Sequence, residues 1–158
     1  MVEDARFEDG DEAPLRLLAA DVDDLAVISA LVQDAVFAAS EMRWLARERR
    51  FALLLNRFRW EDPLARSGAR PPERVQSLLV IDDVLKVQSQ GVAPGDGDTV
   101  LSLLALAFEP GADGTGALVL TLAGDGAVRL EVESVNLLLK DVTRPYRAPS
   151  GKVPEHPL

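Results

Sequence analysis

The sequence predicts an α+β fold, in which one N-terminal helix packs on a curved, mostly antiparallel β-sheet of barrel-like or half-barrel shape. Three observations carry this prediction. Helical periodicity is clear in a single segment, short or alternating apolar runs fill most of the remaining chain, and turns rich in Asp and Gly separate consecutive runs. Consecutive hairpins favour an antiparallel sheet over βαβ units. A sheet of about seven to nine strands with one helix to cover it is expected to curl.

The elements begin after residues 1–14, an acidic lead-in that we expect to be disordered. Residues 16–20, RLLAA, suit a short strand. In the helix that follows, DVDDLAVISALVQDA, Asp21 is a good N-cap, and Asp23 and Asp24 suit the positive end of the helix dipole. The apolar residues that recur at helical spacing and should face the core are Leu25, Ile28, Leu31, Val32 and Ala35.

Strands are expected for most of the chain beyond the helix. The expected ranges are 36–39, 42–46, 51–59, 74–81, 84–90, 99–108, 116–122 and 127–133. Hairpin turns are expected at Asp82-Asp83, at PGADGTG and at GDG, because Asp and Gly favour tight reversals. Residues 134–142 fit either a continuing strand or a short helix, and 61–72 form a long loop. The single α+β domain therefore spans 15–142, with a loosely ordered tail at 143–158.

Composition narrows the classes of partner. The net charge of -9 opposes binding to polyanions, so a nucleic-acid partner is not favoured. The longest apolar runs are too short to span a bilayer, and residues 1–14 lack the pattern of a secretory signal. The chain also has no cysteine, which is compatible with a reducing compartment. We therefore expect a cytoplasmic protein with no membrane partner.

Positive charge is concentrated in one segment. Residues 43–74 contain nine arginines and four acids, so they carry +5 while the rest of the chain carries -14. A candidate anion site in this segment comprises Arg47, Arg49, Arg50, Arg57 and Arg59, with Trp44 and Trp60 available for stacking. The alternative is a strand at 51–59, preferred to a helix, whose arginines reach water at both ends and pair with the protein's own acids. We favour this alternative.

Candidate catalytic groups are scarce. The one histidine, His156, lies near the C-terminus, and with no cysteine the chain lacks the residues of the common nucleophilic triads and of zinc sites. Asp96 and Asp98 resemble the start of a calcium loop, but the later ligands are missing. Glu131 and Glu133 alternate with apolar residues, as in a strand with one solvated face. The sequence thus predicts no catalytic residue, no metal and no cofactor.

Four segments, DLAVISALVQDAV, RRFALLLNRFRWE, LSLLALAFEPG and AVRLEVE, together resemble a family of short bacterial proteins known only as a domain of unknown function. The similarity covers nearly the whole chain beyond residue 14. The resemblance implies a stand-alone, single-domain protein of the bacterial cytoplasm. It supplies no catalytic motif.

Three functions are compatible with these observations. The favoured one is a non-enzymatic protein-interaction or self-associating module, acting through an apolar face or a sheet edge on an unknown protein partner or a second copy of itself. The second is a binder of an anionic ligand, nucleotide or RNA through the Arg/Trp segment. The third is an enzyme that uses carboxylates alone. An enzyme is not favoured, because so few catalytic groups are present.

Overall fold

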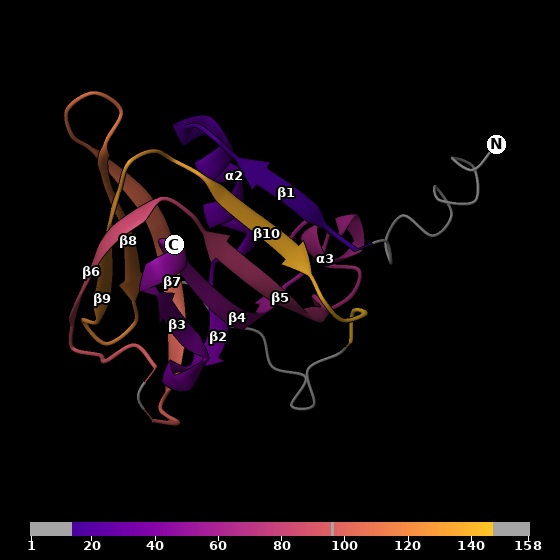
Figure 1. Ribbon diagram of the computed structural model, residues 1–158. Helices are drawn as coiled ribbons and strands as arrows, with labels where there is room; N and C mark the ends of the chain where they lie inside the picture. The colour runs from indigo at the N-terminus through magenta and orange to yellow at the C-terminus, as the bar shows by residue number, and fades with distance from the viewer. Residues whose placement is uncertain (1–13, 96, 147–158) are drawn as a thin grey trace.

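A computed structural model describes residues 14–95 and 97–146 of the chain (Figure 1). Its strands are β1 (Arg16–Ala19), β2 (Ala35–Ala38), β3 (Met42–Leu45), β4 (Arg50–Phe58), β5 (Arg74–Ile81), β6 (Val84–Gln90), β7 (Val100–Pro110), β8 (Gly116–Leu122), β9 (Ala127–Val132) and β10 (Leu137–Asp141). The helices are α2 (Val22–Leu31) and the short α3 (Pro63–Arg66), with 3-10 turns η1 (Ala39–Glu41) and η2 (Ala46–Glu48). No helix in the described ranges has the length and apolar character needed to cross a bilayer.

The strands form one sheet in the order β1-β10-β5-β4-β2-β7-β8-β9-β6, and β3 pairs with β4 beside this path. Every strand pair is antiparallel, as the sequence predicts. The path ends at β1 and β6, so the sheet does not close into a barrel. The fold also holds more strand and less helix than the α+β prediction implies, because only α2 exceeds one turn among the described helices.

A single core lies between the two halves of this open sheet. Figure 1 shows β1, β10 and β5 on one side and β6, β9 and β8 on the other. Leu139 of β10, Leu53 of β4 and Leu130 of β9 belong to the same buried cluster, to which α2 adds Leu25 and Ile28. Burial of such side chains supplies the main favourable free energy of folding.

The N-terminal half of α2 agrees with its prediction. The Asp21 carboxylate accepts a hydrogen bond from the Asp24 backbone N–H at 2.8 Å, which confirms the N-cap. The helix ends at Leu31, however, and not at Ala35. Asp34 has a positive φ of 65° and Ala35 begins β2, so the predicted core residue Ala35 is buried from a strand.

Residues 134–142 contain a strand, β10, which lies between β1 and β5. The hairpins predicted at PGADGTG and GDG are confirmed, since they join β7 to β8 and β8 to β9. The loop predicted at 61–72 contains α3, whose N-cap Asp62 accepts from the Leu64 N–H at 3.1 Å. Residues 1–13 and 147–158 of the expected lead-in and tail lie outside the described residues. Tyr146 pairs with Arg74 at the start of β5 through two backbone hydrogen bonds.

The hairpin predicted at Asp82-Asp83 is wrong. β5 pairs with β4 and β10, whereas β6 pairs with β9, so this dipeptide is a corner that takes the chain from one half of the sheet to the other. Asp83 adopts a φ of 61°, and its carboxylate accepts hydrogen bonds from Ser134 Oγ and Asn136 Nδ2. These contacts to the β9–β10 connection hold the corner, and no short-range pattern reveals them.

Candidate functional site

The candidate arginines and tryptophans form two groups at opposite ends of β4. Trp44 and the arginines at 47, 49 and 50 lie at its start, and the arginines at 57 and 59 lie with Trp60 at its end. A strand rises about 3.3 Å per residue, so the length of β4 places roughly 25 Å between the groups. The structure therefore does not bring these seven residues to one ligand.

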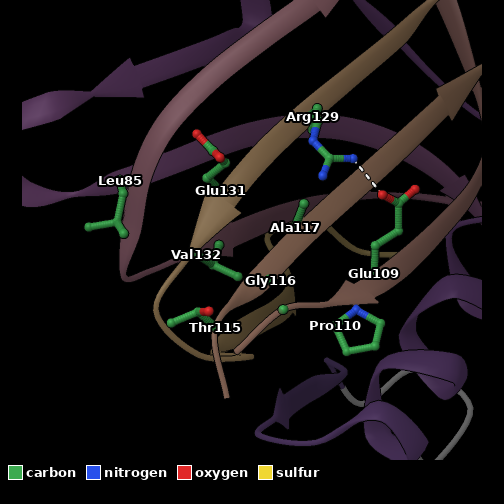
Figure 2. A pocket seen from close by; sticks show the side chains of 10 residues that line it. Leu85, Glu109, Pro110, Thr115, Gly116, Ala117, Arg129, Glu131 and Val132 are labelled. Carbon is green, nitrogen blue, oxygen red and sulfur yellow. Dashed lines mark hydrogen bonds and ion pairs between the residues drawn. The ribbon is translucent and has the colours of Figure 1, made fainter. Parts of the chain in front are cut away.

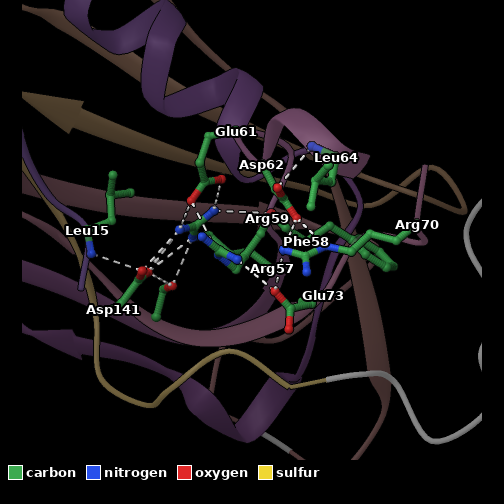
Figure 3. A network of polar contacts seen from close by, with 11 residues as sticks. Leu15, Arg57, Phe58, Arg59, Glu61, Asp62, Leu64, Arg70, Glu73 and Asp141 are labelled. Carbon is green, nitrogen blue, oxygen red and sulfur yellow. Dashed lines mark hydrogen bonds and ion pairs between the residues drawn. The ribbon is translucent and has the colours of Figure 1, made fainter. Parts of the chain in front are cut away.

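Arg57 is the centre of the group at the end of β4 (Figure 3), and its side chain is 0% exposed. Its Nη1 and Nη2 donate to the two carboxylate oxygens of Glu61 at 2.8 and 2.9 Å. Its Nε and Nη2 donate to Asp141 at 3.2 and 3.1 Å, and Nε also reaches Ser77 Oγ at 3.1 Å. The expectation that this guanidinium reaches water is therefore wrong. Arg57 shares the face of β4 that Leu53 and Leu55 bury, so its charged end lies inside the protein.

Further ion pairs extend this cluster into an arginine–carboxylate network. Arg59, only 6% exposed in its side chain, pairs with Glu73 at 2.7 Å, which also contradicts the expectation that it faces water. Arg70 pairs with the N-cap Asp62 at 2.8 Å. The members of the network are Arg57, Arg59, Glu61, Asp62, Arg70, Glu73, Ser77 and Asp141.

The network shifts the pKa values of two carboxyls. Burial raises the pKa of Glu61, but the hydrogen bond and charge of Arg57 outweigh it and leave the pKa below its usual value. Burial likewise raises the pKa of Asp62, and the hydrogen bonds from Arg70 and from the Leu64 N–H lower it by more. Both groups are therefore ionised acceptors whose partners are cations of the same chain. This arrangement fastens β4, β5 and β10 together.

The group at the start of β4 is also largely occupied. Arg49 pairs with Glu133, and Arg50 pairs with Asp82, each at 2.7 Å between partly exposed side chains. Trp44 packs against the core from β3. At the other end, Trp60 donates to the Gln33 carbonyl at 2.9 Å and lies 5.1 Å from the Phe58 ring.

Arg47 is the exception among the five candidate arginines. Of these five, Arg47 alone has no carboxylate partner among the described residues, and it is exposed. One such guanidinium at the surface lacks the converging donors that anion recognition needs.

A broad hollow lies on the outer face of the half-sheet formed by β6, β9, β8 and β7 (Figure 2). Its volume is about 450 Å³, and its lining is Leu85, Glu109, Pro110, Gly111, Thr115, Gly116, Ala117, Arg129, Glu131 and Val132. A second hollow of about 260 Å³ is lined by Gln88, Ser89, Gln90, Glu109, Val119, Ala127 and Arg129. Because the two share Glu109 and Arg129, we treat them as one feature and call it the outer groove.

Strand register explains the groove. Ala117 of β8 lies opposite Glu131 of β9 on one side and Glu109 of β7 on the other. Directly paired residues point to the same face, so a small side chain stands between two long ones. Gly116 lets β7 and β8 approach closely, because a Cβ there would overlap the Glu109 carbonyl oxygen and lie 2.6 Å from the Phe108 ring. Small residues on β8 thus form the floor, and longer side chains form the walls.

Of the three charged side chains that line the larger hollow, two form an ion pair and one does not. Arg129 on β9 donates to Glu109, and Figure 2 shows this ion pair crossing β8, with Glu131 on the same strand as Arg129. No described residue makes a hydrogen bond or ion pair with the Glu131 carboxylate, although Lys86 is its register partner on β6. The groove therefore holds two carboxylates and one guanidinium, with Glu131 unengaged.

Strand β6 borders the groove and presents an open edge. It pairs with β9 only, so among the described strands its second edge has no partner. Four of its last five residues, Lys86, Gln88, Ser89 and Gln90, are exposed. The sequence pattern assigns Glu131 to a solvated face and does not single out Arg129 or Glu109. The alternation in AVRLEVE places Arg129 and Glu131 on one face, and GALVL begins with small residues. These two patterns indicate a groove only once it is known that the two strands are neighbours.

The described residues contain no group of three or more His, Cys, Asp or Glu side chains placed to hold a metal ion. Comparison with known proteins gives no match among curated proteins and none among solved structures. It gives one family, described as "Protein of unknown function (DUF2948)", which matches residues 15–156. This match confirms the resemblance to a family of unknown function. The chain belongs to the DUF2948 family.

Proposed function

We propose that this protein is a non-enzymatic interaction module that binds an extended segment of a partner protein along β6 and the outer groove. The observation that carries the proposal is the open edge of β6 beside a groove on the same half-sheet. An unpaired edge offers a row of backbone N–H and C=O groups, and an added strand satisfies them while its alternate side chains enter neighbouring pockets.

Features of β6 favour one specific strand over unlimited pairing. The register with β9 shifts between Val84 and Lys86, and Lys86 is the one charged residue of the strand. Both a bulge and an edge lysine discourage uncontrolled edge-to-edge association. The regular stretch is confined to residues 86–90, where the pairing with β9 continues without a shift. A short partner segment suits an edge of this length.

The other two functions have less support. The arginine–carboxylate network and the pairs of Arg49 and Arg50 occupy most of the cations that an anionic ligand would need. Glu109 and Glu131 both line the outer groove, but β8 stands between their strands, which places their Cα atoms roughly 9–10 Å apart. Arg129 engages Glu109, whose side chain is 57% exposed. General acid–base catalysis is most effective when an enclosed site tunes a carboxyl pKa, and this open groove encloses neither group.

The proposal is tested by selecting peptides from a random displayed decapeptide library and mapping their contacts by two-dimensional amide NMR. We expect the selected peptides to shift the resonances of β6 and β9. If their shifts lie elsewhere, or if selection yields no peptide that shifts these strands, the proposal is wrong.

Proline substitutions in β6 provide the matched control. Successive N–H groups of a strand point to opposite edges, so one of Gln88 and Ser89 donates towards β9 and the other towards the open edge. Proline at the outward position leaves the ladder intact, whereas proline at the inward position removes a ladder hydrogen bond. Of Gln88→Pro and Ser89→Pro, we therefore expect one to keep the unfolding midpoint and lose peptide binding. Retained binding in both folded variants would contradict strand addition.

A further inference from the structure

From the charges of the outer groove we infer that the partner segment is basic: an extended stretch with Lys or Arg at alternate positions, one of which binds Glu131. This inference rests on the proposed function and names the chemistry of the partner. It starts from Glu131, the groove carboxylate that no described residue engages.

The position of Glu131 strengthens its attraction for a cation. Its side chain is half-buried and lines the hollow of about 450 Å³. Arg129, the cation of the groove lining, already donates to Glu109, so the lining keeps a net charge of -1. The whole chain, groove included, has a net charge of -9, which steers cationic partners towards it.

The shape of the groove suits a long cationic side chain. Ala117 and Gly116 form the floor between the long side chains of Glu109 and Glu131, and the hollow above this floor can take the methylene stem of Lys or Arg once those side chains move apart. Leu85 and Pro110 supply apolar walls for that stem. A long basic side chain buries its stem on such a surface while its charged end reaches a carboxylate.

An acidic partner is disfavoured by the same residues. Its carboxylate would meet the negative charges of both Glu109 and Glu131 in the same hollow. The exposed Lys86 on β6 is the nearest cation in register with Glu131, and it makes no ion pair there. The Glu131 carboxylate thus has no hydrogen-bonded partner among the described residues, although the Lys86 side chain borders it on the same face.

The test uses three synthetic capped decapeptides in which Thr alternates with Lys, with Gln or with Glu. Binding is followed by fluorescence anisotropy, and NMR shifts establish whether each peptide lies on β6 and β9. We expect the Lys peptide to bind about tenfold more tightly than the Gln peptide at low salt, since several charge-assisted contacts replace neutral ones. High salt should reduce this preference.

Two variants assign the preference to Glu131. Glu131→Gln should weaken the Lys peptide about fivefold, and Glu131→Lys should make the Glu peptide the preferred ligand. The matched controls are Asp23→Asn and Asp23→Lys, which change the net charge equally at an exposed residue of α2 that lines neither hollow. The controls should keep the preference for the Lys peptide.

The outcomes separate the two proposals. If the Gln peptide binds to β6 and β9 as tightly as the Lys peptide, the basic partner is wrong and the interaction module stands. If the Asp23 variants weaken the Lys peptide as much as the Glu131 variants do, the preference is a general attraction to an acidic protein and the inference is wrong. If none of these peptides and no selected peptide shifts β6 and β9, the proposed function itself is wrong.

Discussion

Replacing Arg57 by methionine should destabilise the protein by about 3–5 kcal/mol, the usual result of removing one partner from a buried ion pair. The magnitude follows mainly from Asp141, whose side chain is 5% exposed and whose carboxylate would lose its guanidinium partner. Glu61, at 32% exposure, would recover much of its hydration and contribute less. A domain of this kind has a total stability of about 5–15 kcal/mol, so the loss is a large fraction of it.

Urea unfolding followed by circular dichroism measures this change. The midpoint should fall while the slope with denaturant stays constant, because the surface exposed on unfolding is nearly unchanged. Arg50→Met is the matched control on the same strand. Its ion pair with Asp82, at 2.7 Å, is as short as the 2.8 Å pair of Arg57 with Glu61, but the Arg50 and Asp82 side chains are both partly exposed. We therefore expect a loss of stability below about 1 kcal/mol.

A double variant, Arg57→Met with Asp141→Leu, completes the cycle. Because it removes the buried charge as well as its partner, it should be more stable than Arg57→Met alone. The reasoning is refuted if Arg57→Met loses no more stability than Arg50→Met. It is also refuted if the double variant loses as much stability as the single variants Arg57→Met and Asp141→Leu lose together.

Two further predictions concern pH and the groove. The pKa values of Glu61 and Asp62 are lower in the folded protein than in the unfolded chain, where they are about 4.3 and 3.9, so their stabilisation is complete above these values and is lost as the pH falls through the lowered ones. As the pH is lowered below about 4.5, the urea concentration at the unfolding midpoint should therefore decrease, and it should decrease less steeply in Glu61→Gln. A midpoint that rises on acidification would contradict this. Gly116→Ala should destabilise the protein by about 1–3 kcal/mol in urea unfolding, because its Cβ meets backbone and the Phe108 ring. Gly126→Ala, whose Cβ would have ordinary contacts, should change stability little, and equal losses in both would refute the steric account.

Local patterns are sufficient to predict most strands. AVRLEVE alternates between apolar and charged residues, and it forms β9 with Val128, Leu130 and Val132 buried. The end of α2 is harder to predict, because Val32 and Ala35 fit a helical stripe and are indeed buried. The left-handed conformation of Asp34 separates the helix from β2, and nothing in the periodicity forbids a longer helix.

Contacts between distant residues explain what sequence reasoning missed. The alternation of β4 correctly places Arg57 on the face of Leu53 and Leu55. Its burial, however, depends on Asp141, which is 84 residues further along the chain. The outer groove likewise depends on the order β7-β8-β9-β6, because its floor and walls come from different strands. Periodicity within one segment carries no information about either arrangement.

The pairing of β1 with β10 also bears on how the chain folds during synthesis. Among the described strands, β1 pairs with β10 alone, and the Leu15 N–H donates to Asp141 across 126 residues. During synthesis β1 must therefore wait for β10, and Arg57 must wait for the Asp141 carboxylate, although Glu61 is available to it earlier. Such distant closure slows folding and lengthens the time for which unpaired strand edges are open to aggregation. A nascent chain that stalls before β10 would keep β1 without its partner strand and Arg57 without Asp141, a state that chaperones and proteases recognise.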